Sequence, residues 1–251
     1  MLVAILGRQP EIGLAELESV FNGQRIQIFT NEIALIDIDP KEVNFARFGS
    51  VIKFAEVTAN TVAANPAVLQ KIIQETLLKE HPNPDSGKLK FGISSYGQTL
   101  SIGKLNSMAL SIKKALKFKG YSVRVVPNKS PALGSAQVIH NSLTSDNGSE
   151  VLVLQNKQKT LIATTLYEQD IEGYAARDQA RPKRDARVGM LPPKLAQTII
   201  NLAVGPNLNI EYRILDKDDS QNSISKIHDV TILDCFCGTG VILQEALLMG
   251  L

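Results

Sequence analysis

The sequence predicts a fold that combines α/β and α+β parts, and segments near its two ends carry that prediction. Residues 1–60 contain elements in the order strand, helix, strand, strand, helix, strand, which is typical of a ferredoxin-like unit. The last twenty residues contain an apolar, β-branched run at 230–233, a turn with Gly238 and Gly240, and a segment of helical composition. This order is typical of the start of a doubly wound, Rossmann-like domain.

Hydrophobic periodicity places the individual elements. In the N-terminal unit we expect strands at 2–6, 26–29, 33–38 and 52–58, and helices at 11–21 and 43–48. Further along we expect strands at 89–94, 121–126, 151–155, 160–167 and 230–233, and helices at 66–79, 105–119, 136–142, 193–204 and 241–248. Residues 170–192 are polar, basic and poorly periodic, so they are interpreted as an interdomain linker, and 205–229 as a hydrophilic loop.

The distribution of charge is uneven although the net charge is only +2. Residues 86–145 contain no acidic residue and nine basic residues. The simplest interpretation is a surface that faces a polyanion, and the alternative is a solvated, lysine-rich helix. Lys113 and Lys117 lie four residues apart, on one face of the helix expected at 105–119.

The glycines of the C-terminal turn suit a ligand that approaches the backbone. Gly238 and Gly240 can adopt positive φ angles, and the following helix would present free N–H groups to an anionic group. An ordinary strand-to-helix turn with two glycines is the alternative. Leu243 occupies the place of the third glycine of a dinucleotide fingerprint, which disfavours a nicotinamide or flavin cofactor.

Composition excludes several classes of protein. Apolar residues make up 44% of the chain and charged residues 21%, as in a soluble globular protein. No apolar run approaches the roughly 20 residues that span a membrane. Cys235 and Cys237 are too close to favour a mutual disulfide and too few for a structural zinc site, so we expect no metal and a reduced, cytoplasmic environment.

Three segments together resemble a known family. Residues 124–140, with the hairpin after 148, resemble the end of a THUMP domain, an RNA-binding module. Residues 174–196 resemble the junction between THUMP and catalytic domains in tRNA guanine N2-methyltransferases. Asp234-Cys-Phe-Cys-Gly-Thr-Gly240 resembles methyltransferase motif I, commonly Asp-Pro-Phe-Cys-Gly-Thr-Gly. The chain therefore resembles the THUMP-containing, class I S-adenosylmethionine-dependent RNA methyltransferases, and among them the tRNA guanine-10 N2 group.

The resemblance implies a THUMP domain at 61–170, a basic linker at 171–192 and the start of a cofactor-binding domain at 193–251. It implies S-adenosylmethionine as cofactor, tRNA as partner, and methyl transfer to a guanine N2. The residues expected to bind the cofactor are Asp234, Cys235, Phe236, Cys237, Gly238, Thr239, Gly240 and Pro193. The residues expected to bind RNA are Lys113, Lys117, Arg124, Lys129, Arg177, Arg181, Lys183 and Arg184.

Two departures from the family pattern matter. Cys235 stands where the family commonly has proline. The sequence also stops before the acidic residue that would bind the cofactor ribose and before the Pro-Pro-Tyr-type motif. We therefore expect a chain truncated after motif I and inactive by itself, and we name no catalytic residue. A methyltransferase for another RNA, such as rRNA, and a non-catalytic RNA-binding module remain the alternatives; a nicotinamide oxidoreductase is disfavoured.

Overall fold

The computed structural model describes residues 1–23, 25–62, 65–84, 87–180, 190–208 and 231–251. The chain forms two compact units. Unit 1 comprises Met1–Pro10, Ile26–Phe45 and Val51–Ile171, and unit 2 comprises Glu11–Arg25, Ala46–Ser50 and Glu172–Leu251. Each unit is therefore assembled from segments that are distant in the sequence.

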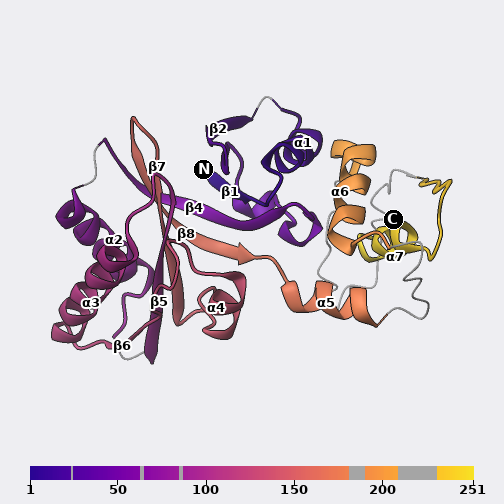
Figure 1. The fold of residues 1–251 in the computed structure, drawn as a ribbon. Helices are drawn as coiled ribbons and strands as arrows, with labels where there is room; N and C mark the ends of the chain where they lie inside the picture. The colour runs from indigo at the N-terminus through magenta and orange to yellow at the C-terminus, as the bar shows by residue number, and fades with distance from the viewer. Residues whose placement is uncertain (24, 63–64, 85–86, 181–189, 209–230) are drawn as a thin grey trace, which may run out of the picture. The chain divides into compact units, whose positions relative to one another are not determined.

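Unit 1 is built on one continuous sheet in the order β2-β3-β1-β4-β8-β7-β5-β6 (Figure 1). The strands are β1 (Leu2–Leu6), β2 (Ile26–Thr30), β3 (Ile33–Ile36), β4 (Val51–Thr61), β5 (Lys88–Gly97), β6 (Ser122–Val125), β7 (Gly148–Gln155) and β8 (Thr160–Glu168). β4 pairs antiparallel with β8, so a single sheet carries both the N-terminal strands and the strands after residue 88.

The N-terminal half of the sheet has the strand order and direction of a ferredoxin-like unit. All pairs among β2, β3, β1 and β4 are antiparallel, with Ala4 opposite both Ala34 and Phe54. The helix expected at 43–48 is wrong. Two short 3₁₀ turns, Pro40–Glu42 and Phe45–Arg47, stand there instead, the first capped by the Asp39 side chain, which accepts a hydrogen bond from the Lys41 amide.

The other half of the sheet is mixed. β5 pairs in parallel with β6 and β7, whereas β7 and β8 form an antiparallel hairpin. Helices α2 (Pro66–Glu80) and α3 (Ile102–Phe118) lie on one side of these strands and α4 (Ser135–His140) on the other (Figure 1). A Cβ atom at Gly92 would lie only 2.4 Å from Leu133 Cδ1, so any larger residue there would displace the Leu133 side chain, which lies before α4.

The core between the sheet and α2/α3 explains why the two helices form where apolar residues repeat at helical spacing. Its most buried members are Leu69, Ile73, Leu77, Phe91, Ile93, Leu105, Ile112, Leu116, Val151, Val153 and Ile162. α3 begins three residues before the expected position because Ser101 acts as its N-cap, with Oγ accepting a hydrogen bond from the Lys104 amide.

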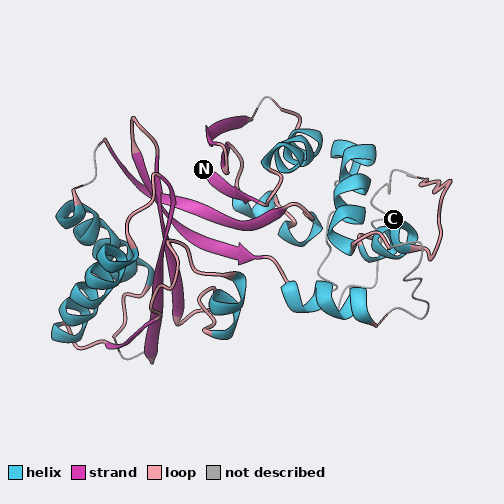
Figure 2. Ribbon diagram, in the orientation of Figure 1, coloured by secondary structure: helices cyan, strands magenta, loops and turns pink. Residues whose placement is uncertain are grey.

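Unit 2 is helical in its described part (Figure 2). It contains α1 (Pro10–Phe21), α5 (Ile171–Gln179), α6 (Pro193–Val204), a 3₁₀ turn (Gly205–Leu208) and α7 (Val241–Leu248). α6 and α7 pack through Ile200, Ala246 and Met249, with Ile232 against the same cluster. The first nine residues of the expected linker thus form helix α5.

One predicted strand is wrong. Residues 231–233 do not form a β-strand, and the rest of the segment expected at 230–233 lies outside the described residues. A strand needs a hydrogen-bonded neighbour, and no strand of unit 2 lies within its described part to supply one. Residues 209–229 of the expected loop also lie outside the described residues. No described helix has both the length and the apolar content to cross a membrane.

Candidate functional site

The segment Asp234–Gly240 forms two successive turns that end on helix α7. Asp234 Oδ1 accepts a hydrogen bond from the Phe236 amide at 3.0 Å, and the Gly240 amide donates to the Cys237 carbonyl at 2.6 Å. The first contact folds the chain back over two residues, as an aspartate at the start of a turn commonly does. The second closes the chain immediately before α7.

Both glycines of this segment have left-handed backbone angles. Gly238 has a φ of 48° and Gly240 a φ of 79°. A Cβ atom built at Gly240 would meet nothing within 4 Å, and one at Gly238 would meet only the Phe236 carbonyl oxygen at 3.7 Å. Backbone conformation, not crowding, therefore requires glycine here, and the space beside the turn is open to a ligand.

The N-terminus of α7 faces this turn without a side-chain cap. Gly240 is the N-cap residue and has no side chain to accept hydrogen bonds from the first helical turn. The first amides of a helix lack intrahelical partners and carry the positive end of the helix dipole. Cys235, Phe236 and Cys237, in the turn that precedes this helix, are all exposed. The arrangement can accept an anionic or hydroxyl-bearing group.

Contacts with α5 and α6 hold α7 in place. Arg177 Nε of α5 lies 2.9 Å from Glu245 Oε1, and the Glu245 side chain is buried. The Tyr174 ring contacts two cations, with Arg177 Cζ 4.5 Å and Lys194 Nζ 5.1 Å from its centroid, and its hydroxyl donates a hydrogen bond to Gln197 Oε1. Arg177 therefore supports α7, and its contact with RNA stays a prediction.

Pro193, the other residue expected near the cofactor, is buried as the first residue of α6. Pro192 precedes it as the N-cap, and proline at the first helical position costs no hydrogen bond because that amide has no intrahelical partner. Nearby, Gly49 is needed because a Cβ atom there would lie 2.0 Å from the Lys194 carbonyl oxygen. The start of α6 is thus closely packed, and cofactor contact by Pro193 stays a prediction.

The residues expected to bind RNA fall into three groups. Lys117, Arg124 and Lys129 are exposed in unit 1, and Lys113 is half-buried on the same helix, α3. Arg177 belongs to unit 2. Arg181, Lys183 and Arg184 lie outside the described residues. The lysines of α3 form no ion pair within the part of the chain that the structure describes, so their charges are available to a partner.

A buried polar network in unit 2 was not found from the sequence. The Glu16 carboxylate accepts hydrogen bonds from the amides of Gly49 and Ser50 at 3.0 and 2.9 Å, from the Ser50 hydroxyl, and from Asn201 Nδ2 at 2.7 Å. Arg47 donates to Asn201 Oδ1 from Nε and Nη2, and burial lowers the pKa of Arg47 to about 10 against the opposing effect of Glu16. The network connects α1, residues 47–50 and α6.

A second buried cluster lies in the sheet of unit 1. Lys53 Nζ is 2.7 Å from Glu150 Oε1 and 3.1 Å from Glu168 Oε2. Glu150 also accepts hydrogen bonds from Ser94 and Thr165. Burial is the largest single effect on the pKa of Lys53 and lowers it, but Glu150, Tyr96 and Glu168 together outweigh burial, so the pKa lies above its ordinary value. Burial raises the pKa of Glu168, partly offset by Lys53.

The raised pKa of Glu168 predicts a pH dependence of stability. The folded protein holds a proton on Glu168 more tightly than the unfolded chain, so the stabilising contribution is complete below the unfolded pKa and is lost as pH rises through the folded pKa. Glu168→Gln mimics the protonated form. In denaturant titrations, its free energy of unfolding relative to the wild type should therefore increase as the pH rises from the ordinary pKa of a glutamate towards the raised pKa of Glu168.

Glu56→Gln is the matched control, because Glu56 is an exposed carboxylate on β4, the strand that carries Lys53. Its difference from the wild type should be nearly constant with pH. If the Glu168→Gln difference were equally flat, the carboxyl of Glu168 would not be destabilised when charged in the folded protein.

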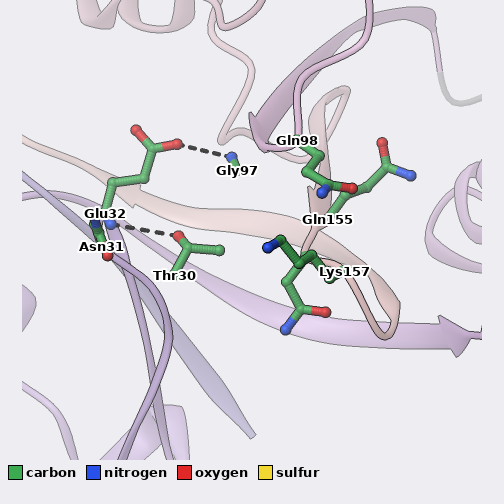
Figure 3. A pocket seen from close by; sticks show the side chains of 8 residues that line it. Thr30, Asn31, Glu32, Gly97, Gln98, Gln155 and Lys157 are labelled. Carbon is green, nitrogen blue, oxygen red and sulfur yellow. Dashed lines mark hydrogen bonds between the residues drawn. The ribbon is translucent and has the colours of Figure 1, made fainter.

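A cavity of about 400 Å³ lies at the tips of two hairpins in unit 1. Figure 3 shows its lining from the β2–β3 turn, the end of β5 and the β7–β8 turn. Glu32 is held there by a 2.8 Å hydrogen bond from the Gly97 amide to Oε1. None of the residues expected from the sequence to bind cofactor or RNA lines this cavity, so it is not part of the candidate site.

Comparison with known proteins gives no match to a family model and none to a curated protein. Solved structures with a similar fold include TrmN from Thermus thermophilus, with 15% identity and a TM-score of 0.45 over 80% of this chain and 54% of TrmN. A possible methylase from Clostridium difficile 630 has 13% identity and a TM-score of 0.46 over 99% of this chain and 55% of that chain. SMU.472, solved in complex with SAH, has 13% identity and a TM-score of 0.47 with the same coverage.

The chain thus spans about half the length of these three solved proteins. All three TM-scores lie below 0.5, so the similarity does not by itself establish the activity of this chain.

Proposed function

We propose that this chain is the RNA-binding and partial cofactor-binding portion of an S-adenosylmethionine-dependent methyltransferase that acts on a guanine N2 in tRNA. One observation carries the cofactor part of this proposal. The segment that resembles motif I forms an open turn with Gly238 and Gly240 at positive φ and leads directly into the uncapped N-terminus of α7. A turn of this kind leaves main-chain amides free for a ligand.

The residues of the turn fit one end of S-adenosylmethionine. That cofactor has a carboxylate and ribose hydroxyls, which free amides and the Asp234 side chain can bind, and the open space beside both glycines lets it approach the backbone. When bound, the cofactor supplies a methyl group that is already activated on a sulfonium. Asp234–Gly240 would then hold the cofactor, and α7 would fix the turn through the Arg177–Glu245 contact.

The lysine-rich surface of unit 1 supports the RNA part of the proposal. α3 carries Lys104, Lys113, Lys114 and Lys117 and no acidic residue. Exposed cations without carboxylate partners bind phosphates without reading sequence, which suits a surface that positions a folded RNA. A base in structured RNA must leave its stack to be methylated, so firm binding of the surrounding RNA would be needed.

Two other functions share these features. A methyltransferase for a different RNA would use the same turn and the same lysines. Measured affinities for tRNA and for rRNA fragments would separate the two functions, because the main proposal predicts tighter binding of tRNA. An RNA-binding module without catalysis would use the lysines but would not bind S-adenosylmethionine. The geometry of Asp234–Gly240 favours a protein that binds the cofactor over this last alternative.

Charge reversal on α3 tests the RNA part. Lys113→Glu combined with Lys117→Glu should weaken tRNA binding by about 10-fold or more at low salt. It should also reduce the slope of log affinity against log salt concentration by about 1 for each lost phosphate contact. Filter binding or fluorescence anisotropy over a range of salt concentrations measures both. The thermal midpoint should change little, because neither lysine forms an ion pair among the described residues and neither is fully buried.

The matched control is Lys41→Glu with Lys157→Glu, which changes the net charge equally at two exposed lysines outside α3. It should lower the affinity much less. Equal weakening by both double variants would point to net charge alone, and an affinity that does not depend on salt would contradict the proposed surface.

A further inference from the structure

Phe118, the last residue of α3, is 95% exposed. Elsewhere in unit 1, Phe29, Phe54 and Phe91 are buried in the cores of the sheet. The Phe118 ring is therefore accessible to a partner outside the unit.

The residues next to Phe118 in the sequence are basic, and helix α3 contains no acidic residue. Lys114 lies one helical turn before Phe118, and Lys117 and Lys119 are its neighbours in the chain. All three lysines are exposed and none forms an ion pair among the residues that the structure describes. Leu110 is 54% exposed and lies on the side of the helix that carries Lys114, one turn later, and Lys117, two turns later. We call Leu110, Lys114, Lys117, Phe118 and Lys119 the α3 stripe.

An aromatic ring among unpaired lysines has the chemistry of a site for single-stranded nucleic acid. The ring offers a face on which an unpaired base can stack, and the lysines bind the phosphates on either side. In a duplex the faces of the bases are already stacked, so only the phosphates could be bound. The core of a protein–protein interface is instead depleted in lysine, and Phe118 with Leu110 offers too little apolar area for a stable dimer.

We propose that Phe118 stacks on an unpaired base, so that the α3 stripe binds a single-stranded segment of RNA. This rests on the proposed RNA-binding function and adds to it the kind of RNA structure that is bound. The role of Phe118 in this is separate from that of Lys113 and Lys117, because stacking does not depend on salt as phosphate contacts do. The proposal therefore predicts a preference for single strands that one side chain controls.

The test compares Phe118→Ala, Phe118→Trp and the wild type. The probes are a short single-stranded RNA that contains one 2-aminopurine and the same strand annealed to its complement. Phe118→Ala should weaken binding of the single strand by about 10-fold and leave binding of the duplex unchanged. It should also abolish the quenching of 2-aminopurine fluorescence that stacking causes. Phe118→Trp keeps a stacking surface, so its affinity and quenching should match or exceed the wild type.

Other outcomes distinguish this proposal from the function on which it rests. Should Lys113→Glu with Lys117→Glu weaken binding while Phe118→Ala binds single strand as the wild type does, the RNA-binding function stands and the stacking role is wrong. Absence of RNA binding by the wild type would overturn both. If the wild type sediments as a dimer and Phe118→Ala as a monomer, the partner of Phe118 is a second copy of the chain and the stacking proposal is wrong. Because Phe118 is exposed, circular dichroism should show that every variant folds.

Discussion

Replacing Lys53 by methionine should lower the free energy of unfolding by about 3–5 kcal/mol. Lys53 Nζ lies within 3.1 Å of carboxylate oxygens of both Glu150 and Glu168, and its side chain is 1% exposed. Methionine has a similar volume, so packing changes little, but two carboxylates lose their buried cation. Denaturant titration of the full chain at neutral pH measures the loss.

Lys41→Met is the control, because Lys41 is exposed and the same substitution there should change stability by about 0.5 kcal/mol or less. Adding Glu150→Gln and Glu168→Gln to Lys53→Met should restore part of the lost stability by removing the uncompensated charges. If Lys53→Met alone were as stable as the wild type, the ion pairs of Lys53 would make no net contribution to the free energy of unfolding.

Replacing Glu16 by alanine should have an effect of comparable size, about 3–5 kcal/mol. Glu16 is fully buried, and its carboxylate satisfies the amides of Gly49 and Ser50 as well as Asn201 Nδ2. Alanine leaves these donors buried without an acceptor and removes the negative charge nearest to Arg47. The transition of unit 2, which contains the whole network, should move to lower temperature.

Glu18→Ala is the matched control, because Glu18 is an exposed carboxylate on the same helix. Its midpoint in differential scanning calorimetry should stay close to that of the wild type. Equal stability of the two variants would mean that the Glu16 network makes no net contribution to unit 2.

These two networks also show where the sequence stopped being informative. The period of apolar residues predicts a helix at 11–21, and α1 forms there with Leu17 and Val20 buried. It carries no information about Glu16, because the groups that this carboxylate binds lie at Gly49, Ser50 and Asn201, far along the chain. Lys53 poses the same difficulty, since its partners belong to β7 and β8.

Local signals predicted local structure well. Helices α6 and α7 have the bounds expected from their apolar spacing, and glycine chemistry correctly predicted positive φ at Gly238 and Gly240. The strand expected at 230–233 was wrong because composition reports a preference and a strand also needs a paired neighbour. The short helix expected at 43–48 did not form because the backbone at Val43 is extended, with φ −111° and ψ 120°, and this separates two 3₁₀ turns.

The most direct test of the central claim uses the two cysteines of the candidate cofactor turn. Cys235 and Cys237 are the only cysteines in the chain, and both are exposed. Their rates of alkylation by iodoacetamide, followed by mass spectrometry, therefore report directly on the turn. Increasing S-adenosylmethionine should slow alkylation of both cysteines to a plateau, while equal concentrations of NAD should leave the rates unchanged. Rates that stay constant at every concentration of S-adenosylmethionine would contradict the claim that Asp234–Gly240 binds this cofactor.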